Sequence, residues 1–192
     1  MKGMDPMKYL LVFAFLTPLA VCADDGLVVT LAKPANSIDS ERGVIEVTMH
    51  NDSAKPLYLA PWSTLRYDYF FNVFCIRDAQ GKVAEHRINM GKPIADEASF
   101  QTLAPHSTHT YHVDLDRVYD LPDGPIDVTY TSQTIYDVPD AESETTLKWT
   151  KPSNTLHAWI NRALLRPAKD HDDWQRQVSY NTNCDGEFAQ PR

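Results

Sequence analysis

Three histidines stand three residues apart in the segment HSTHTYH, at His106, His109 and His112. Imidazole is a common zinc ligand, and on a helix this spacing would bring the three rings to one face. The surrounding residues alternate between apolar and polar types, however, which indicates a strand. On a strand His109 and His112 point to opposite faces, and His106 follows Pro105 in a turn. We therefore predict turn and surface histidines here and no metal site.

Other patterns that support catalysis do not occur in the sequence. Glu85 and His86 are adjacent, but the HExxH string of zinc proteases is missing, as are the GxSxG and GxxxxGK[ST] strings. Cys75 lies in an apolar segment and lacks the electropositive setting of a reactive thiol. Asp114 and Asp116 are expected on an outer strand face and in a turn, as solvated side chains. We expect a protein that is not an enzyme and that uses no cofactor.

Five aromatic side chains stand within PWSTLRYDYFF, residues 61–71. One interpretation is packing in the core and between sheets, which suits Phe71 at the start of a strand. The other is a loop that presents aromatic and arginine anchors, the residue types enriched in binding hot spots. The loop residues that are free to face a partner are Trp62, Leu65, Arg66 and Tyr67.

Short alternating segments separated by turn residues fill most of the chain. Strands are expected at 27–32, 43–51, 54–62, in a hairpin around RDAQGK, on both sides of Pro105, and at 126–133 and 154–160. Seven to nine short strands without strand–helix alternation predict an all-β fold, an immunoglobulin-like antiparallel β-sandwich. The domain is expected at 24–162, followed by an irregular polar tail at 163–192 with at most a short helix near 170–178.

Alternation also predicts which side chains face the core. The inward sets are Ile45, Val47 and Met49; Phe71, Val73 and Cys75; Tyr111, Val113 and Leu115; and Ile126, Val128 and Tyr130.

Residues 1–23 have the pattern of a secretory signal peptide. Lys2 and Lys8 accompany the apolar run YLLVFAFLTPLAV, and Val21 and Ala23 precede a charged segment. We expect cleavage after Ala23 and a periplasmic or secreted protein, since the run is short for a membrane span. The alternative is a lipid anchor on Cys22.

The composition limits the kinds of partner. The chain has 192 residues, with 43% hydrophobic and 23% charged, which is typical of a globular protein. Its formal net charge of −8 disfavours nucleic acid and anionic membrane surfaces. The charge would suit a basic partner, and the family resemblance given below implies a protein partner.

Two cysteines remain after signal cleavage, Cys75 and Cys184. An oxidising compartment favours a disulfide between them, which would add about 4–5 kcal/mol by the loop-entropy model. The alternative is that Cys75 is a buried thiol in the core.

Four segments carry a family resemblance: HNDSAKPLYLAPWSTL, FNVF, MGKPIADEASFQTLAPHSTHTYHVDLDRVYDL and SNTLHAWI. In order and spacing they resemble the N-terminal pro-domain of deuterolysin-like (aspzincin) secreted zinc metallopeptidases, over roughly residues 27–160. The chain departs from that pattern at Ser63–Leu65, at Met90–Pro93, and at His106, where the family has a turn glycine. VSYNTNC is similar to the start of a mature peptidase, but the zinc-binding domain is not expected in this chain.

The resemblance implies a role and a contact surface. The family pro-domain covers the active site of its enzyme, keeps it latent and assists its folding. Carried over, the surface would comprise the loop Trp62–Tyr67 and the segment Gly91–Phe100, in which Gly91, Pro93 and Phe100 match the family motifs. The resemblance brings no metal ligand with it. The alternative is a structural or adhesive immunoglobulin-like module that binds a glycan or a cell-envelope protein.

Overall fold

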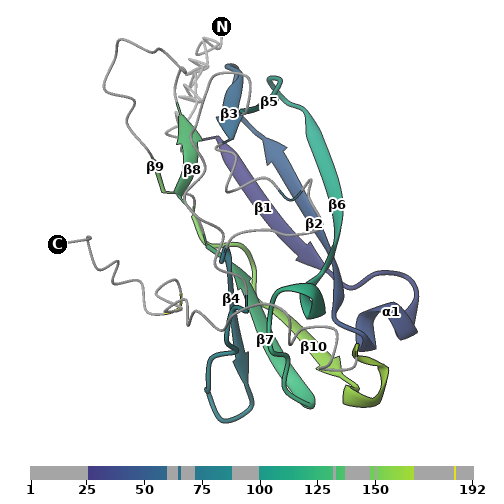
Figure 1. Cartoon of the computed structure of the whole chain (residues 1–192). Helices are drawn as coiled ribbons and strands as arrows, with labels where there is room; N and C mark the ends of the chain where they lie inside the picture. Colours follow the sequence, from purple (N-terminus) through teal and green to yellow (C-terminus); the bar gives the residue numbers. More distant parts are fainter. Residues whose placement is uncertain are drawn as a thin grey trace, which may run out of the picture.

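The regular structure is almost entirely β, as the sequence predicted. The computed structural model describes residues 26–59, 65, 72–87, 100–131, 133–136, 148–149, 151–166 and 184. The elements, in chain order (Figure 1), are β1 Leu27–Ala32, α1 Ser37–Glu41, β2 Val44–Asn51, β3 Leu57–Leu59, β4 Phe74–Asp78, β5 Gln101–Leu103, β6 Thr108–Asp114, the 3-10 turn η3 Leu115–Arg117, β7 Gly124–Tyr130, β8 Gln133–Tyr136, β9 Lys148–Trp149, β10 Leu156–Ile160 and the 3-10 turn η4 Arg162–Leu164.

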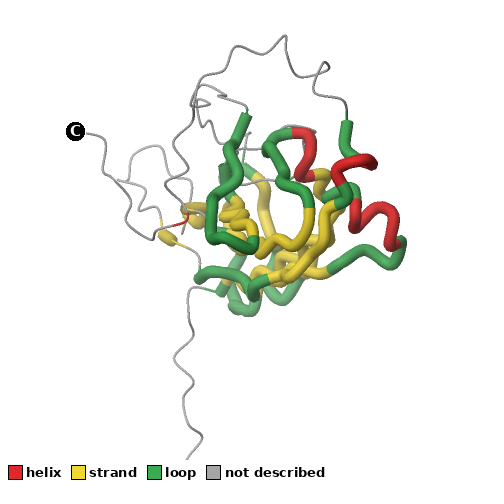
Figure 2. The backbone as a smooth tube through the Cα atoms, turned by 90° about the horizontal axis from the view of Figure 1, so that it is seen from below, coloured by secondary structure: helices red, strands yellow, loops and turns green. Residues whose placement is uncertain are grey.

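The strands form three antiparallel sheets. Two are three-stranded, with the orders β1-β2-β6 and β10-β7-β4, and the third has the order β5-β3-β8-β9. The short β3–β5 and β3–β8 pairings of the third sheet lie at one end of the molecule, and the β10-β7-β4 sheet lies toward the other (Figure 1). Viewed at right angles, the helical segments lie at the periphery of the strands (Figure 2).

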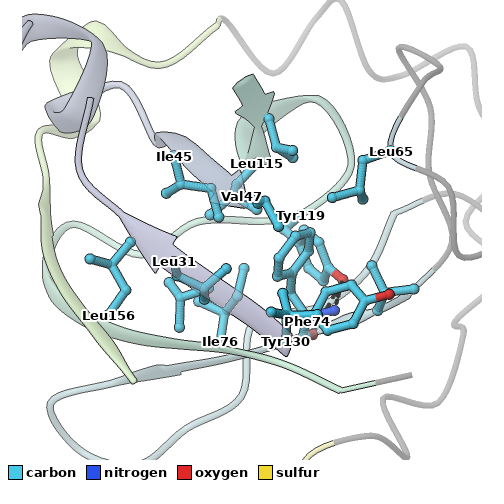
Figure 3. Close-up of a cluster of buried hydrophobic side chains, with 14 of the residues drawn as sticks. Leu31, Ile45, Val47, Leu65, Phe74, Ile76, Leu115, Tyr119, Tyr130 and Leu156 are labelled. Carbon is cyan, nitrogen blue, oxygen red and sulfur yellow. Dashed lines mark hydrogen bonds between the residues drawn. The ribbon is translucent and has the colours of Figure 1, made fainter. Parts of the chain in front are cut away.

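Both three-stranded sheets direct alternate side chains into one hydrophobic core. In β2, Ile45, Val47 and Met49 are buried, as their alternation predicted. In β7, buried Ile126, Val128 and Tyr130 confirm the corresponding prediction. Figure 3 shows residues from both sheets, among them Leu31, Ile45, Ile76 and Tyr130, gathered in the same cluster.

The set of inward side chains predicted around β4 is only partly right. Phe74 and Ile76 are the fully buried side chains of this strand, whereas Cys75 lies on the opposite side, in the disulfide described below. Val73 is also buried, and Phe71 lies outside the described residues. The four consecutive residues Val73 to Ile76 are all apolar. Without a polar residue among them, alternation cannot show which of these side chains face the core.

The helix α1 was not predicted from the sequence. Its N-cap is Asn36, whose side chain accepts a hydrogen bond from the Ile38 N–H. The helix ends at Glu41 with Arg42 as its C-cap. Gly43, the next residue, has a φ of +87°, and a Cβ there would lie 2.5 Å from Leu121 Cδ1. Gly43 therefore permits both the left-handed turn into β2 and the close packing of Leu121.

The chain after β10 continues to pack on the domain. Asn161 caps η4, and Leu165 is partly buried against the core. Residues 163–166, which the sequence assigned to the tail, therefore belong to the folded body. The expected signal segment and the expected helix near 170–178 lie outside the described residues. No helix in the described ranges is long and apolar enough to cross a membrane.

Candidate functional site

Most of the contact surface expected from the sequence lies outside the described residues, namely Trp62, Arg66, Tyr67, Gly91 and Pro93. Two of its members are described. Leu65 is 6% exposed and belongs to the hydrophobic core, so its expected role in partner contact is corrected to packing (Figure 3). Phe100 is half-buried immediately before β5.

The three histidines do not gather. His109 and His112 are exposed on β6, where they stand opposite Met49 and Glu46 of β2, respectively. His106 has a φ of 56°, in the left-handed region that glycine favours, in the turn before β6. Among the described residues, no group of three or more His, Cys, Asp or Glu side chains could hold a metal ion.

The two aspartates expected to be solvated are instead structural anchors. Asp116 is 3% exposed, and its Oδ2 accepts the Arg166 N–H at 2.8 Å. Asp114 Oδ2 lies 2.6 Å from Arg166 Nη2, 3.6 Å from Arg117 Nε and 3.9 Å from Arg42 Nη2. The sequence prediction failed because η3 turns Asp116 toward the chain that follows β10. These carboxylates bind the segment 162–166 to the domain.

Cys75 and Cys184 form a disulfide across a sequence separation of 109 residues. Cys75 faces away from the core on β4, and Arg77 Nη2 on the same strand donates to the Cys184 carbonyl at 3.1 Å. The pairing that the sequence left open is therefore present. Arg166 and Cys184 are thus both bonded to the domain.

The outer face of the β10-β7-β4 sheet carries an exposed tryptophan. Trp159 on β10 is 59% exposed and stands beside exposed Pro125 of β7. In the next row, His157 Nδ1 and Asp127 Oδ1 are hydrogen-bonded at 2.5 Å. We call these four side chains the Trp159 face.

The Trp159 face is continuous with the disulfide. Asp127 is flanked by His157 on β10 and by Arg77 on β4, and Cys75 stands opposite Thr129, two residues further along β7. The face thus has one large aromatic group on a rigid strand, next to polar groups that can form hydrogen bonds. Such an arrangement is suited to binding and provides no nucleophile–base pair.

Trp159 was not among the site residues predicted from the sequence, although the segment NTLHAWI was predicted as the last strand. Strict alternation then buries Leu156, Ala158 and Ile160 and leaves His157 and Trp159 outside, as the structure shows.

Comparisons with known proteins give no family assignment. No protein-family model matches the chain, and no curated protein matches it. The likeness to metallopeptidase pro-domains rests on the motifs quoted above.

Proposed function

We propose that this chain is an exported, non-catalytic binding domain of immunoglobulin-like type. It binds a partner metallopeptidase and restrains it or helps it fold. The observation that carries the binding role is the Trp159 face, since a tryptophan that is 59% exposed on a paired strand is a pre-ordered anchor.

The strand order supports the immunoglobulin-like type. If β1, β2, β4, β6, β7 and β10 are equated with strands A, B, C, E, F and G, the two sheets have the orders A-B-E and G-F-C. This is the arrangement of an immunoglobulin sandwich without a D strand beside E. The single core shared by the two sheets agrees with that topology.

The disulfide supports export. A bond that closes 109 residues of chain persists where the surroundings are oxidising, as in the periplasm or outside the cell. The expected signal peptide predicts the same destination. The loop residues Trp62, Arg66 and Tyr67 and the segment Gly91–Phe100 are a second contact surface, inferred from the family resemblance.

The test is capture of a partner from the secreted fraction of the producing organism, followed by titration of the purified partner. The disulfide-bonded chain, the variant Trp159→Ala and the control Ile38→Ala would be compared. Ile38 is 58% exposed on α1, so the control removes a similarly exposed apolar side chain elsewhere. We expect capture of a zinc peptidase, and Trp159→Ala to weaken binding by about 30-fold or more.

The outcomes separate the roles. Reduced activity of the captured peptidase supports restraint, and unchanged activity with improved refolding supports assistance. If a folded Trp62→Ala/Arg66→Ala variant loses binding while Trp159→Ala does not, the loop is the contact surface. If no peptidase is captured from a fraction that contains one, the proposal fails and the glycan-binding or envelope-binding alternative replaces it.

A further inference from the structure

The two three-stranded sheets have four edge strands, β1, β6, β4 and β10. An edge strand presents N–H and C=O groups that can pair with another strand, and folded proteins usually cover or guard them. Successive residues of an antiparallel strand direct these groups to opposite sides, so the register tells which residues face outward.

Two edges are each closed at one residue by a side chain from a distant part of the sequence. On β1, the Leu31 N–H donates to Asn154 Oδ1 at 2.8 Å, and Asn154 Nδ2 donates to the Leu31 carbonyl at 3.0 Å. On β4, the Phe74 N–H donates to the Tyr119 hydroxyl at 3.1 Å, and that hydroxyl lies 3.2 Å from the Phe74 carbonyl. Each side chain thus takes the place of a neighbouring strand.

Backbone groups close more of these edges. The Ala84 N–H donates to the Ile76 carbonyl, and the Asp78 N–H donates to the Lys82 carbonyl, both at 2.9 Å, so the returning chain covers the rest of β4. Just beyond β10, the Asn161 N–H donates to the Glu41 carbonyl of α1 at 3.0 Å. Within the described residues, β4 is thus closed along its length, β1 is closed at Leu31, and the chain just beyond β10 is bonded to α1.

The β6 edge differs. The bonds Leu115 N–H to Gly43 carbonyl and Asn51 N–H to Ser107 carbonyl show that odd-numbered residues face β2. The backbone groups that point outward belong to Thr108, Thr110, His112 and Asp114. No bond reaches these outward groups from elsewhere in the described part of the chain.

This edge also lacks the usual guards. Thr108, Thr110 and His112 are exposed, and β6 contains no proline and no lysine. Figure 1 shows β6 at the outside of its sheet, with β2 as its neighbour.

We propose that β6 pairs with β6 of a second copy of this chain, which makes a two-fold symmetric, six-stranded antiparallel sheet β1-β2-β6-β6-β2-β1. This inference does not depend on the partner-binding role proposed above, because it uses the other three-stranded sheet. The Trp159 face stays exposed in such a dimer.

The sequence of β6 selects one register. With the two-fold axis at Tyr111, Thr110 pairs with His112 of the partner subunit and Thr108 pairs with Asp114 of the partner subunit. All four outward-facing residues are then used, and no side chain meets an identical charge. An axis at His112 would place two imidazoles side by side, and an axis at Thr110 would leave Asp114 beyond the pairing.

Two local features favour this register. Asp114, the acidic residue on β6, is already balanced by Arg166, Arg117 and Arg42, so it adds little repulsion at the edge. Tyr111 is partly buried against the core, and at the axis it would meet Tyr111 of the partner subunit in a non-hydrogen-bonded pair. Aromatic cross-strand pairs at such positions stabilise sheets.

The test combines sedimentation equilibrium with amide hydrogen exchange on the purified, disulfide-bonded chain, from about 10 μM to about 1 mM. We expect a reversible monomer–dimer equilibrium. Exchange at the Thr108, Thr110 and His112 amides should slow by about tenfold as the dimer forms. The variant Thr110→Pro, which removes an outward N–H, should sediment as a monomer. The matched control Thr110→Ala loses the same hydroxyl but keeps the N–H, and it should dimerise.

Contrary results are equally definite. A monomer at every concentration, or a dimer that persists in Thr110→Pro, would overturn the proposal. Protection of the three amides that does not change with concentration would also overturn it, since a segment of the same chain would then cover the edge. The exchange measurement needs no variant, so the proposal stays testable if Thr110→Pro does not fold.

Discussion

The strands β4 and β6 each end a three-stranded sheet, and their outward N–H and C=O groups are chemically equivalent. At β4, the Tyr119 hydroxyl and the returning chain at Lys82–Ala84 occupy those groups. At β6, within the described residues, the same kinds of group face outward without a bond. The two regions differ in what the rest of the chain brings to each edge.

That difference shows that the closing of a sheet edge depends on tertiary contacts with residues far away in the sequence. Tyr119 is 45 residues away from Phe74, and Asn154 is 123 residues away from Leu31. A strand pattern fixes which side chains are inside, but it carries no information on which distant amide or hydroxyl will reach the edge. The comparison predicts that changes at the closed edges cost stability, whereas changes at the open edge affect association.

The largest expected effect is at the disulfide, which adds a covalent tie to the closed strand β4. Replacing both Cys75 and Cys184 with alanine should lower the free energy of unfolding by about 4–5 kcal/mol, because the unfolded chain regains the entropy of a closed loop. Guanidinium unfolding measures the change. Adding a reductant should lower the stability of the wild type toward that of the variant. Equal guanidinium unfolding midpoints for the oxidised wild type and the variant would show that the disulfide does not stabilise the fold.

Opening the β4 edge is the next largest change. Tyr119→Phe removes the hydroxyl that bonds Phe74 in a fully buried site, at a cost of about 1–3 kcal/mol in unfolding free energy. Tyr58→Phe is the matched control, since Tyr58 is only half-buried, on β3. A loss no larger than that of the control would mean that the hydroxyl does not close the edge in solution.

The same hydroxyl predicts a dependence on pH. Burial raises the pKa of Tyr119 above its ordinary value of 10.0, so the unfolded chain releases this proton first. The contribution of Tyr119 is therefore complete below about pH 10 and is lost as pH rises beyond it, by up to about 1.4 kcal/mol per pH unit. Unfolding free energies of wild type and Tyr119→Phe should converge above that pH. If the unfolding free energies of the two proteins instead change with pH in parallel, the raised pKa of Tyr119 is contradicted.

Opening the β1 edge should cost less, because Asn154 is exposed and water can replace part of its bonding. Asn154→Ala removes two hydrogen bonds to Leu31 and should lower the unfolding free energy by about 1–2 kcal/mol. Thr155→Ala, at an exposed neighbouring position, is the control and should have little effect. Faster hydrogen exchange of the Leu31 amide in Asn154→Ala would show that the stability is lost at the β1 edge. Unchanged exchange at Leu31 would show that the stability is lost elsewhere.

The sequence predicted the β class and most inward faces, because alternation is a local signal. Ile45, Val47 and Met49 follow it, as do Ile126 and Val128. The same rule failed at Phe74, where an unbroken apolar run hides the phase. The sequence pattern could not reveal the α1 helix, although Asn36 marks its start, because a helix of only five residues is too short to show a helical repeat of apolar residues.

The site was less predictable than the fold. Asp116 was expected in solvent because its partner, the Arg166 amide, is 50 residues away. Leu65 was expected at the surface because its neighbours in the sequence resemble a loop, yet it packs in the core. In both cases a contact that is distant in sequence decided the burial. Trp159, in contrast, could have been identified from alternation alone.

The smallest expected effect is at the open edge, and it tests the comparison directly. In dilute solution, Thr110→Pro should lower the unfolding free energy by less than about 0.5 kcal/mol relative to Thr110→Ala, because the lost N–H has no partner within the described monomer. Both variants lose the bond between the Thr48 and Thr110 hydroxyl groups, 3.2 Å apart, so their difference isolates the backbone. A cost above about 2 kcal/mol, together with a Thr110 amide that is protected from exchange in dilute wild type, would mean that this N–H is bonded in the monomer. The β6 edge would then be closed like the others, and the contrast with β4 would disappear.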